Sequence, residues 1–309
     1  MILVDNLEDF SCVDHSIVTS GTFDGVHVGH QKILRQLVET AKFHKGQSIV
    51  ITLWPHPRFV LKRDPESLKL LSTFEEKAAL IEEMGVDILL KVPFTKDFSE
   101  LSSQSFIEDI IIKKLKTEVL IIGYDHRFGK NREGGFDYLM EHASEFGFEV
   151  KEIPREDIDH AGVSSTRIRN ALAAGEVHIA SELLGRHYSL SGFVKDGDRI
   201  GRSIGFPTAN IDVPESYKLI PCDGAYAVYI HLGNEKFQGM LNIGWRPTVS
   251  GQERRIEVNI FNFDREIYNK RLTIEFVQLL RKEKKFDSIE LLKDQLNKDK
   301  SQALDALSL

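Results

Sequence analysis

Two histidines three positions apart, His27 and His30, carry the clearest chemical signal in this chain. They belong to a short segment, the histidine loop (residues 21–30), which follows an apolar run at residues 17–19 and precedes a helical pattern of apolar residues. If the helix begins near Val28, both imidazoles face one site at its N-terminus, where backbone N–H groups and partial positive charge are available. Because imidazoles donate hydrogen bonds to phosphoryl oxygens, the loop predicts a site that holds and transfers phosphate.

The histidine loop has a second interpretation, in which His27 and His30 only cap the helix and hydrogen-bond to its backbone. Gly25 and Gly29 leave space for a ligand to approach the backbone. Together with the position between a strand and a helix, these glycines favour the phosphate site.

A second polar cluster, residues 163–170, contains Ser165, Thr166, Arg167 and Arg169 and precedes an Ala/Leu-rich helix. A serine or threonine that caps a helix beside solvated arginines is the simpler interpretation. Cations are better placed at the other end of a helix, however, so two arginines here favour an anion bound between them.

A third cluster, residues 123–129, contains Asp125 and Phe128 and directly follows an apolar run at residues 119–122. Ligands of open parallel sheets bind beyond the carboxyl ends of the strands. Taken alone, however, the glycines and the aspartate of this cluster indicate a turn.

Two segments of the C-terminal part also have the composition of a reactive site. Thr208 and Asn210 are two positions apart, so in an extended segment they face one side, and their oxygens suit Mg²⁺. In residues 256–260 the apolar side chains alternate, which leaves Glu257 and Asn259 on the other face. Glu257 is then either a solvated glutamate or a general base that takes a proton from an alcohol, and Thr208 and Asn210 otherwise belong to a turn that enters a strand.

The elements that must position these residues form two groups. The first consists of apolar strands alternating with helices, which predicts a Rossmann-like α/β fold with a parallel sheet and helices on both faces. The predicted strands are residues 17–19, 48–54, 88–92, 119–122 and 150–153, and the predicted helices are residues 31–44, 73–84, 102–115, 136–146, 165–173 and 177–184.

The second group begins after residue 185, where short alternating strands separated by Gly, Pro, Asp and Asn predict a small antiparallel barrel. A charged amphipathic helix is predicted at about residues 288–297. We therefore predict two domains, residues 1–185 and 186–309. The predicted barrel strands are residues 188–194, 226–231, 238–243, 256–263 and 272–277.

Composition narrows the function classes. The 309 residues are 41% hydrophobic and 28% charged, with a net charge of −7, which argues against a general nucleic-acid binder. The two cysteines, Cys12 and Cys222, form no motif, which fits a reducing compartment. The sequence contains neither a signal peptide nor an apolar run of about 20 residues. We therefore expect a cytoplasmic protein with no nucleic-acid or membrane partner, and the oligomeric state stays open.

The three N-terminal clusters, in this order and spacing, resemble the FMN adenylyltransferase module of bacterial bifunctional riboflavin kinase/FAD synthetases. The resemblance implies that His27 and His30 stabilise charge on the transferred α-phosphoryl group of ATP. It also implies that Asp125 and Phe128 bind the flavin. The residues that it implies for ATP binding in this module are Gly21, Phe23, Gly29, Ser165, Thr166 and Arg169.

The C-terminal segments resemble the riboflavin kinase module of the same enzymes, and residues 241–248 and 281–288 extend the match. This resemblance implies that Thr208 and Asn210 bind Mg²⁺ and ATP. It implies that Glu257 is the base acting on the ribityl 5′-hydroxyl group. Gly201 and Gly205 would lie in a loop over the nucleotide.

The implied function has two steps with riboflavin, FMN and ATP as small-molecule partners and Mg²⁺ as cofactor. Riboflavin and ATP give FMN and ADP in the C-terminal domain, and FMN and ATP give FAD and pyrophosphate in the N-terminal domain. Three alternatives stay open: an adenylyltransferase whose kinase is inactive, since Trp245 and residues 195–196 depart from the kinase pattern; a flavin- or nucleotide-binding protein without turnover; and a cytidylyltransferase.

Overall fold

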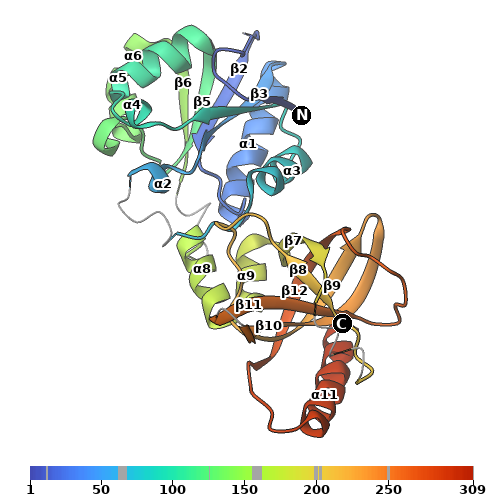
Figure 1. Cartoon of the computed structure of the whole chain (residues 1–309). Helices are drawn as coiled ribbons and strands as arrows, with labels where there is room; N and C mark the ends of the chain where they lie inside the picture. The colour runs from blue at the N-terminus through green and yellow to red at the C-terminus, as the bar shows by residue number, and fades with distance from the viewer. Residues whose placement is uncertain are drawn as a thin grey trace. The chain divides into compact units, whose positions relative to one another are not determined.

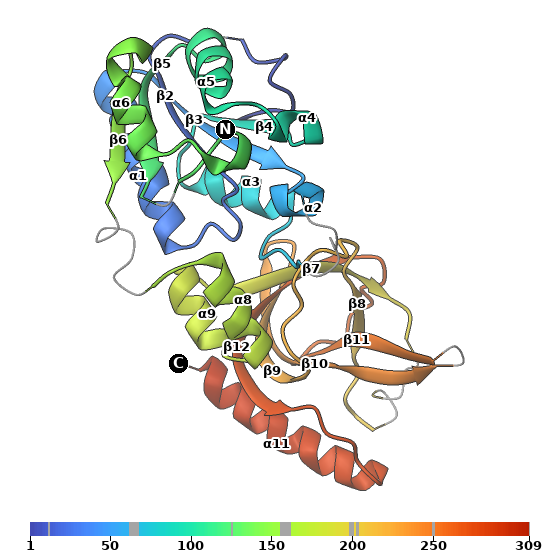
Figure 2. The ribbon, with the colours of Figure 1, turned by 90° about the vertical axis from the view of Figure 1, so that its left-hand side faces the viewer.

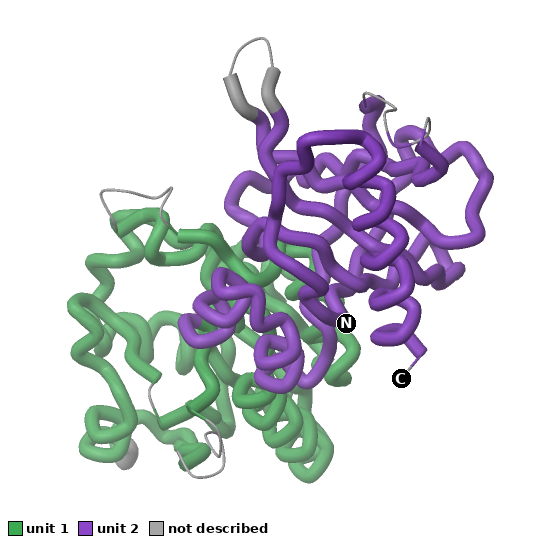
Figure 3. The backbone as a smooth tube through the Cα atoms, turned by 90° about the horizontal axis from the view of Figure 1, so that it is seen from below, with its two compact units in different colours: residues 1–165 green, residues 166–309 purple. Residues whose placement is uncertain are grey.

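The computed structural model describes residues 1–11, 13–61, 68–124, 126–154, 162–197, 201, 204–248 and 251–308. The chain divides into two compact units, Met1–Ser165 and Thr166–Leu309, which are described separately (Figure 3). Packing alone defines these units, so the predicted functional boundary at residue 185 stays a prediction.

The first unit contains a parallel six-stranded sheet with the strand order β1-β4-β3-β2-β5-β6 (Figure 1). All neighbouring strands run parallel, as predicted. The edge strand β1 is an addition to the prediction, because three residues are too few to show a period. The strands are β1(Ile2–Val4), β2(Ser16–Gly21), β3(Gln47–Trp54), β4(Ile88–Pro93), β5(Thr117–Gly123) and β6(Glu149–Ile153).

Helices cover both faces of this sheet, which confirms the predicted architecture (Figures 1 and 2). Neighbouring strand residues alternate between two buried clusters: Ile17 belongs to the one packed under α1 and α3, and Val18 belongs to the one packed under η2 and α6. The helices are α1(Val28–His44), α2(Pro57–Leu61), α3(Phe74–Glu83), α4(Lys96–Ser99), α5(Ser103–Ser105), the π-helix η2(Phe106–Lys114), the 3₁₀-helix η3(Lys130–Arg132) and α6(Phe136–Phe146).

The second unit is a closed antiparallel barrel with the strand order β10-β11-β8-β7-β12-β9, preceded by two helices and followed by one. The barrel confirms the prediction, although the four-residue strand β8 was predicted only as an extended segment. Its elements are α8(Ser165–Ala174), α9(Val177–Leu184), β7(Tyr188–Lys195), β8(Ala209–Asp212), β9(Gly224–Leu232), β10(Glu235–Thr248), β11(Gly251–Ile260), β12(Arg271–Lys282) and α11(Ile289–Leu307).

The predicted end of the last helix near residue 297 is wrong, because α11 continues to Leu307 (Figure 2). Ala303 and Leu307, four residues apart, pack with Met240 and Phe261 of the barrel in one buried cluster. This tertiary contact stabilises the last turns, which are too polar in sequence to indicate where the helix ends.

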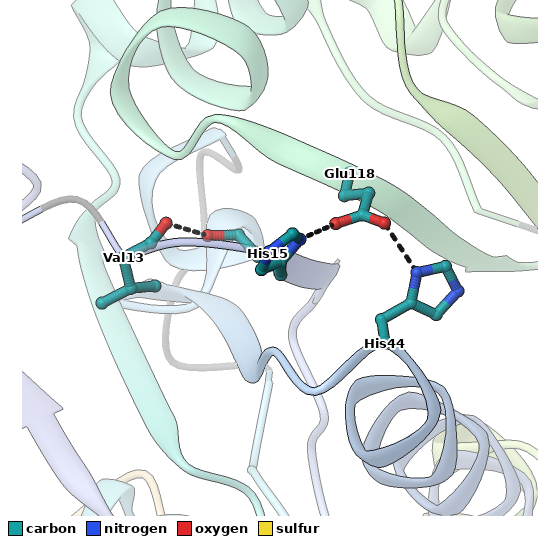
Figure 4. Close-up of polar contacts among 5 residues, drawn as sticks. Val13, His15, His44 and Glu118 are labelled. Carbon is teal, nitrogen blue, oxygen red and sulfur yellow. Dashed lines mark hydrogen bonds and ion pairs between the residues drawn. The ribbon is translucent and has the colours of Figure 1, made fainter.

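At the amino end of the sheet, one carboxylate joins three elements (Figure 4). Glu118 of β5 contacts Nδ1 of His15, just before β2, at 2.6 Å, and Nδ1 of His44, at the end of α1, at 2.7 Å. The nearby Ser16 hydroxyl donates to the carbonyl of Val13 at 3.2 Å. Because this cluster lies at the opposite end of β2 from the histidine loop, it belongs to the scaffold.

Glu118→Gln tests this contact through the pH dependence of stability. Hydrogen bonds from His44 and His15 hold the pKa of Glu118 below its ordinary value of 4.5, so the carboxylate stabilises the fold above pH 4.5. That contribution is lost as the pH falls through the lowered pKa. Because the group is exposed, we expect the variant to lose less than about 1 kcal/mol in the free energy of unfolding at neutral pH.

Denaturant unfolding at neutral pH and at about pH 3 measures this difference between wild type and variant. The difference should shrink at the lower pH, because protonation of Glu118 removes the carboxylate that the variant lacks. An equal loss at both pH values would contradict the role given to the carboxylate.

Candidate active sites

The histidine loop leaves the end of β2 through three residues with positive φ: Phe23 at 48°, Gly25 at 79° and Val26 at 39°. Phe23 and Val26 are only 2% and 1% exposed, so their side chains anchor the loop in the core under α1. This anchoring offsets the strain of the left-handed backbone at two non-glycine residues. The loop is therefore held in one shape.

His27 and His30 lie together at the N-terminus of α1, as predicted. His27 is the N-cap residue, and its Nδ1 accepts a hydrogen bond from the His30 N–H at 3.3 Å. The two imidazoles are stacked, with 3.6 Å between ring centroids and 13° between planes. The Phe23 and His30 rings form a T-shaped pair with 5.2 Å between their centroids. The capping interpretation thus holds for His27, but it leaves the His30 ring unexplained.

His30 has a buried ring nitrogen, Nδ1, that finds no hydrogen-bond partner among the described residues. Burial lowers the pKa of His30 well below its ordinary value, and the nearby charges of His27 and Lys77 lower the pKa further. The ring is therefore neutral at physiological pH with one hydrogen bond unused. A bound polyphosphate would favour the imidazolium form and raise this pKa.

Gly21 and Gly29, which the resemblance assigns to ATP, lie near the two ends of the loop. Gly21 is the last residue of β2, and Gly29 is buried in the first turn of α1. A Cβ on Gly21 would lie 3.1 Å from the ring of Phe23. The small size of Gly21 therefore already serves packing, and contact of these residues with ATP stays a prediction.

Asp24 ties the loop to a segment far away in sequence. Its carboxylate, 4% exposed, accepts hydrogen bonds from the N–H of Leu71 at 2.9 Å and of Ser72 at 3.2 Å. Ser72 Oγ in turn accepts from the Gly25 N–H at 3.1 Å. Sequence reasoning missed these partners, because residues 70–72 carry no motif of their own.

The second sequence cluster meets the histidine loop through Ser165, whose Oγ donates to the Asp24 carbonyl at 3.0 Å. This contact brings together two of the motifs predicted to share ATP. Thr166 and Arg169 follow in α8, within the second unit. Their contact with ATP stays a prediction.

The third cluster contributes a loop beside β2. Asp125, the residue predicted to seat the flavin, lies outside the described residues. His126 Nε2 and Ser20 Oγ of β2 are 3.1 Å apart, and burial lowers the pKa of His126 to about 4. Phe128 is 8% exposed and packs against Phe106, with ring centroids 5.4 Å apart. Its ring therefore anchors the loop in the core, and its contact with flavin stays a prediction.

In the barrel, strand register places Asn210, Glu257 and Asn242 in one row across β8, β11 and β10. Their neighbours Leu241 and Val258 are 1% and 0% exposed and fill the barrel interior. Since side chains alternate along a strand, the row lies on the outer face. The structure thus brings the predicted base Glu257 directly opposite the predicted metal ligand Asn210.

Two hydrogen bonds fix residues in and beside this row. Arg246 Nη2 donates to Glu257 Oε2 at 3.1 Å. The buried Asn259 donates through Nδ2 to the carbonyl of Pro207 at 2.7 Å, which fastens the chain just before the exposed Thr208. Sequence reasoning missed Arg246 as a partner of the base, because the contact depends on the pairing of β10 with β11.

Asn210 has an unused acceptor: its Oδ1 is buried and has no hydrogen-bond partner in the described part of the chain. A Cβ on Gly197 would lie 1.9 Å from Asn210 Nδ2, and one on Gly201 would lie 3.4 Å from Thr208 Oγ1. Gly205 has a φ of 87°, which a side chain would strain. The buried amide oxygen of Asn210 and the hydroxyl of Thr208, each beside a glycine, are of the oxygen type that Mg²⁺ takes as ligands.

Glu283, which sequence reasoning did not single out, lies beside the same row. Burial raises the pKa of its carboxyl, although nearby Arg246 and Arg281 and a hydrogen bond with Asn242 oppose the shift. A Cβ on Gly244 would lie 2.6 Å from Glu283 Oε1. The outer face therefore holds two carboxylates, with Arg246 close to both.

Two family models match the chain, one in its N-terminal part and one in its C-terminal part. The FAD synthetase family model matches residues 10–167, and the riboflavin kinase family model matches residues 184–307. A bifunctional riboflavin kinase/FMN adenylyltransferase of Listeria monocytogenes is 41% identical over 286 residues, covering 92% of this chain and 90% of the relative. The chain belongs to the bifunctional riboflavin kinase/FMN adenylyltransferase family. The kinase match contains Glu257, and the FAD synthetase match contains the histidine loop.

Further members of the family are similar over nearly the same span. The Bacillus subtilis protein is 37% identical, covering 94% of this chain and 92% of the relative, and the Escherichia coli K12 protein is 35% identical, covering 95% and 93%. Both carry the name bifunctional riboflavin kinase/FMN adenylyltransferase.

One solved structure is similar over almost the whole chain. It is described as a macrolide-efflux protein from Streptococcus pneumoniae, with a TM-score of 0.87 and 30% identity, and 97% of each chain is covered. The efflux activity in that description refers to the Streptococcus pneumoniae protein. Within the described residues of this family member, no helix is both long and apolar enough to cross a membrane.

Asp24→Ala tests whether the buried carboxylate holds the histidine loop. The variant leaves the N–H groups of Leu71 and Ser72 without their partner, and hydrogen bonds to a charged group contribute about 1.5–3 kcal/mol each. We expect the free energy of unfolding of the first unit to fall by at least about 2 kcal/mol.

Chemical denaturation followed by circular dichroism measures this loss. Ser72→Ala, which removes only the hydrogen bond to the Gly25 N–H, serves as the matched control with a smaller expected effect. If Asp24→Ala unfolded at the same denaturant concentration as wild type, the anchoring role of the carboxylate would be wrong.

Proposed function

We propose that the two steps of flavin synthesis occur at the two sites described above. The barrel phosphorylates riboflavin to FMN, and the histidine loop binds the ATP that adenylylates FMN to FAD. The observation that carries the assignment is the stacked pair of His27 and His30, with a buried nitrogen on His30 that has no partner in the described part of the chain. Buried polar atoms in folded proteins rarely go without a hydrogen-bond partner, so this nitrogen supports a bound ligand.

Adenylyl transfer requires positioning and charge stabilisation rather than a protein nucleophile. A phosphate oxygen of FMN attacks the α-phosphorus of ATP, the bond from this phosphorus to the bridging oxygen breaks, and pyrophosphate leaves. His30 donates a hydrogen bond to the developing charge on the α-phosphoryl group. Because the bound polyphosphate raises the pKa of the buried imidazole, substrate binding itself favours the protonated, stronger donor.

In the kinase step, Glu257 accepts the proton of the riboflavin 5′-hydroxyl as its oxygen attacks the γ-phosphorus of ATP and ADP leaves. Arg246 orients the Glu257 carboxylate through their 3.1 Å contact. Thr208 and Asn210 would hold Mg²⁺, which supplies positive charge to the phosphate oxygens when bound.

Two residues that depart from the kinase pattern, Lys195 and Trp245, leave the strand register of this row intact. Lys195 pairs with Asp212 at 2.6 Å, and Trp245 is 52% exposed. Asn210, Glu257 and Asn242 keep their register beside them. This arrangement favours two active modules over an adenylyltransferase with an inactive kinase.

His30→Ala should stop the second step while leaving the first intact. We expect FAD formation from FMN and ATP to fall by about 10²-fold or more, because a donor to the transition state is lost. Chromatography of the products from riboflavin and Mg-ATP should show FMN accumulating. His142→Ala is the matched control, because this imidazole contacts the Tyr138 carbonyl of its own helix at 2.9 Å.

Glu257→Gln should have the reverse effect. We expect phosphorylation of riboflavin to fall by about 10²–10⁴-fold, because the amide cannot accept the proton. The same variant, supplied with FMN, should form FAD at the wild-type rate. Glu253→Gln, on the same strand but paired with Arg255, is the control that should keep both activities.

The two variants together test the assignment of one step to each site. If either His30→Ala or Glu257→Gln stopped both half-reactions in a folded protein, the two-site model would be wrong. A wild-type chain that bound flavin and ATP without forming either product would support the binding-protein alternative instead.

A further inference from the structure

One buried cation near the histidine loop has no part in the chemistry assigned so far. Lys77 lies on α3, which begins with a capping box formed by Thr73 and Glu76, and only 3% of Lys77 is exposed. Its Nζ donates to Thr52 Oγ1 at 2.7 Å and to the Thr22 carbonyl at 3.2 Å. A lysine is rarely buried so completely without a reason specific to its surroundings.

The surroundings of Lys77 combine aromatic walls with charges of both signs. Its Nζ lies 5.2 Å from the Trp54 ring centroid and 5.4 Å from that of Phe74. Asp24 stabilises the ammonium form, whereas Lys91 of β4 opposes it. Two imidazoles also lie near Lys77. Besides burial, the charge of Lys77 lowers the pKa of His30. His56 lines the same small pocket as Lys77, Thr22 and Asp24.

A short chain of contacts leads from Lys77 to the reactive histidine. Lys77 donates to the carbonyl of Thr22, which directly precedes Phe23, and the Phe23 ring forms a T-shaped pair with the His30 ring, with 5.2 Å between centroids. The second hydrogen bond, to Thr52 at the carboxyl end of β3, fixes Nζ against the sheet. A shift of the Thr22 carbonyl would therefore move the ring that supports His30.

We propose that Lys77 is a positioning residue for adenylyl transfer, whose ammonium group holds the start of the histidine loop and adds positive charge beside the ATP phosphates. The inference rests on the proposed function and assigns this site a residue that the family motifs described above do not include. It differs from a purely structural role, because it requires the charge of Lys77 and not only its volume.

Burial, the largest cause, and Lys91 lower the pKa of Lys77 to about 8, although Asp24 opposes the shift. The ammonium group is therefore present at neutral pH and is lost as the pH rises through about 8. Because kcat/KM reports groups of the free enzyme, kcat/KM for ATP in the FAD-forming step should fall above this pH. Bound ATP favours the ammonium form, so kcat should fall only at higher pH.

The test compares Lys77→Met and Lys77→Arg with wild type in FAD formation from FMN and ATP, between about pH 6.5 and 9.5. We expect Lys77→Met to lower kcat/KM for ATP by about tenfold or more at neutral pH, since small misplacements of reactive groups have effects of this size. It should also lose the alkaline fall near pH 8. Lys77→Arg should retain most activity and move the fall to higher pH, because arginine keeps its proton.

Lys91→Met is the matched control, because it removes a neighbouring charge that pairs with Asp5 and does not touch the loop. It should keep the wild-type kcat/KM at neutral pH and shift the alkaline fall upward, since Lys91 lowers the pKa of Lys77. Phosphorylation of riboflavin by each variant should be unchanged, and thermal melting should report folding.

A Lys77→Met variant with the wild-type pH profile, or with a lower melting temperature as its only change, would overturn the inference. Should Lys77→Met fail to fold, the profiles of wild type, Lys77→Arg and Lys91→Met still decide, and three identical profiles would overturn it. A wild-type chain that forms no FAD would instead refute the proposed function itself.

Discussion

Much of the N-terminal candidate site depends on how firmly a polar, glycine-containing turn is tied to the segments beside it. Asp24 is central to this anchoring. Its buried carboxylate accepts hydrogen bonds from the backbone N–H groups of residues 71 and 72, and its carbonyl accepts one from the Ser165 hydroxyl. When such a carboxylate is buried, its hydrogen bonds to water are replaced by hydrogen bonds from fixed donors of the protein. The loop, the segment before α3 and Ser165 are therefore joined by hydrogen bonds beside the histidine pair.

In the barrel, strand register rather than a buried charge positions the polar side chains of the candidate site. Because side chains alternate along each strand, the pairing of β8 with β11 and of β11 with β10 fixes which three polar residues share a row. A slip by one residue would turn Glu257 into the apolar interior. The closed barrel opposes such a slip, because its strands have neighbours on both sides.

The sequence predicted the features that local pattern determines. Continuous apolar runs located the parallel strands, and the polar residues that follow them located the histidine loop. The edge strand β1 and the last turns of α11 escaped prediction, because packing on distant elements stabilises them more than their own residues do. The same reason explains why Lys77, Arg246 and Glu283 were missed. Each lies beside its candidate site through tertiary contacts that no spacing along the chain reveals.

The buried, uncharged state of His30 has a consequence for selectivity. In the resting protein the ring carries no net charge, so it exerts little attraction on small anions such as chloride or inorganic phosphate. A ligand must bring enough negative charge, anchored at several points at once, to drive a proton onto the ring. Under the proposed function, the triphosphate of ATP meets this demand better than chloride or a single phosphate group does, so burial of one imidazole favours the substrate over small anions.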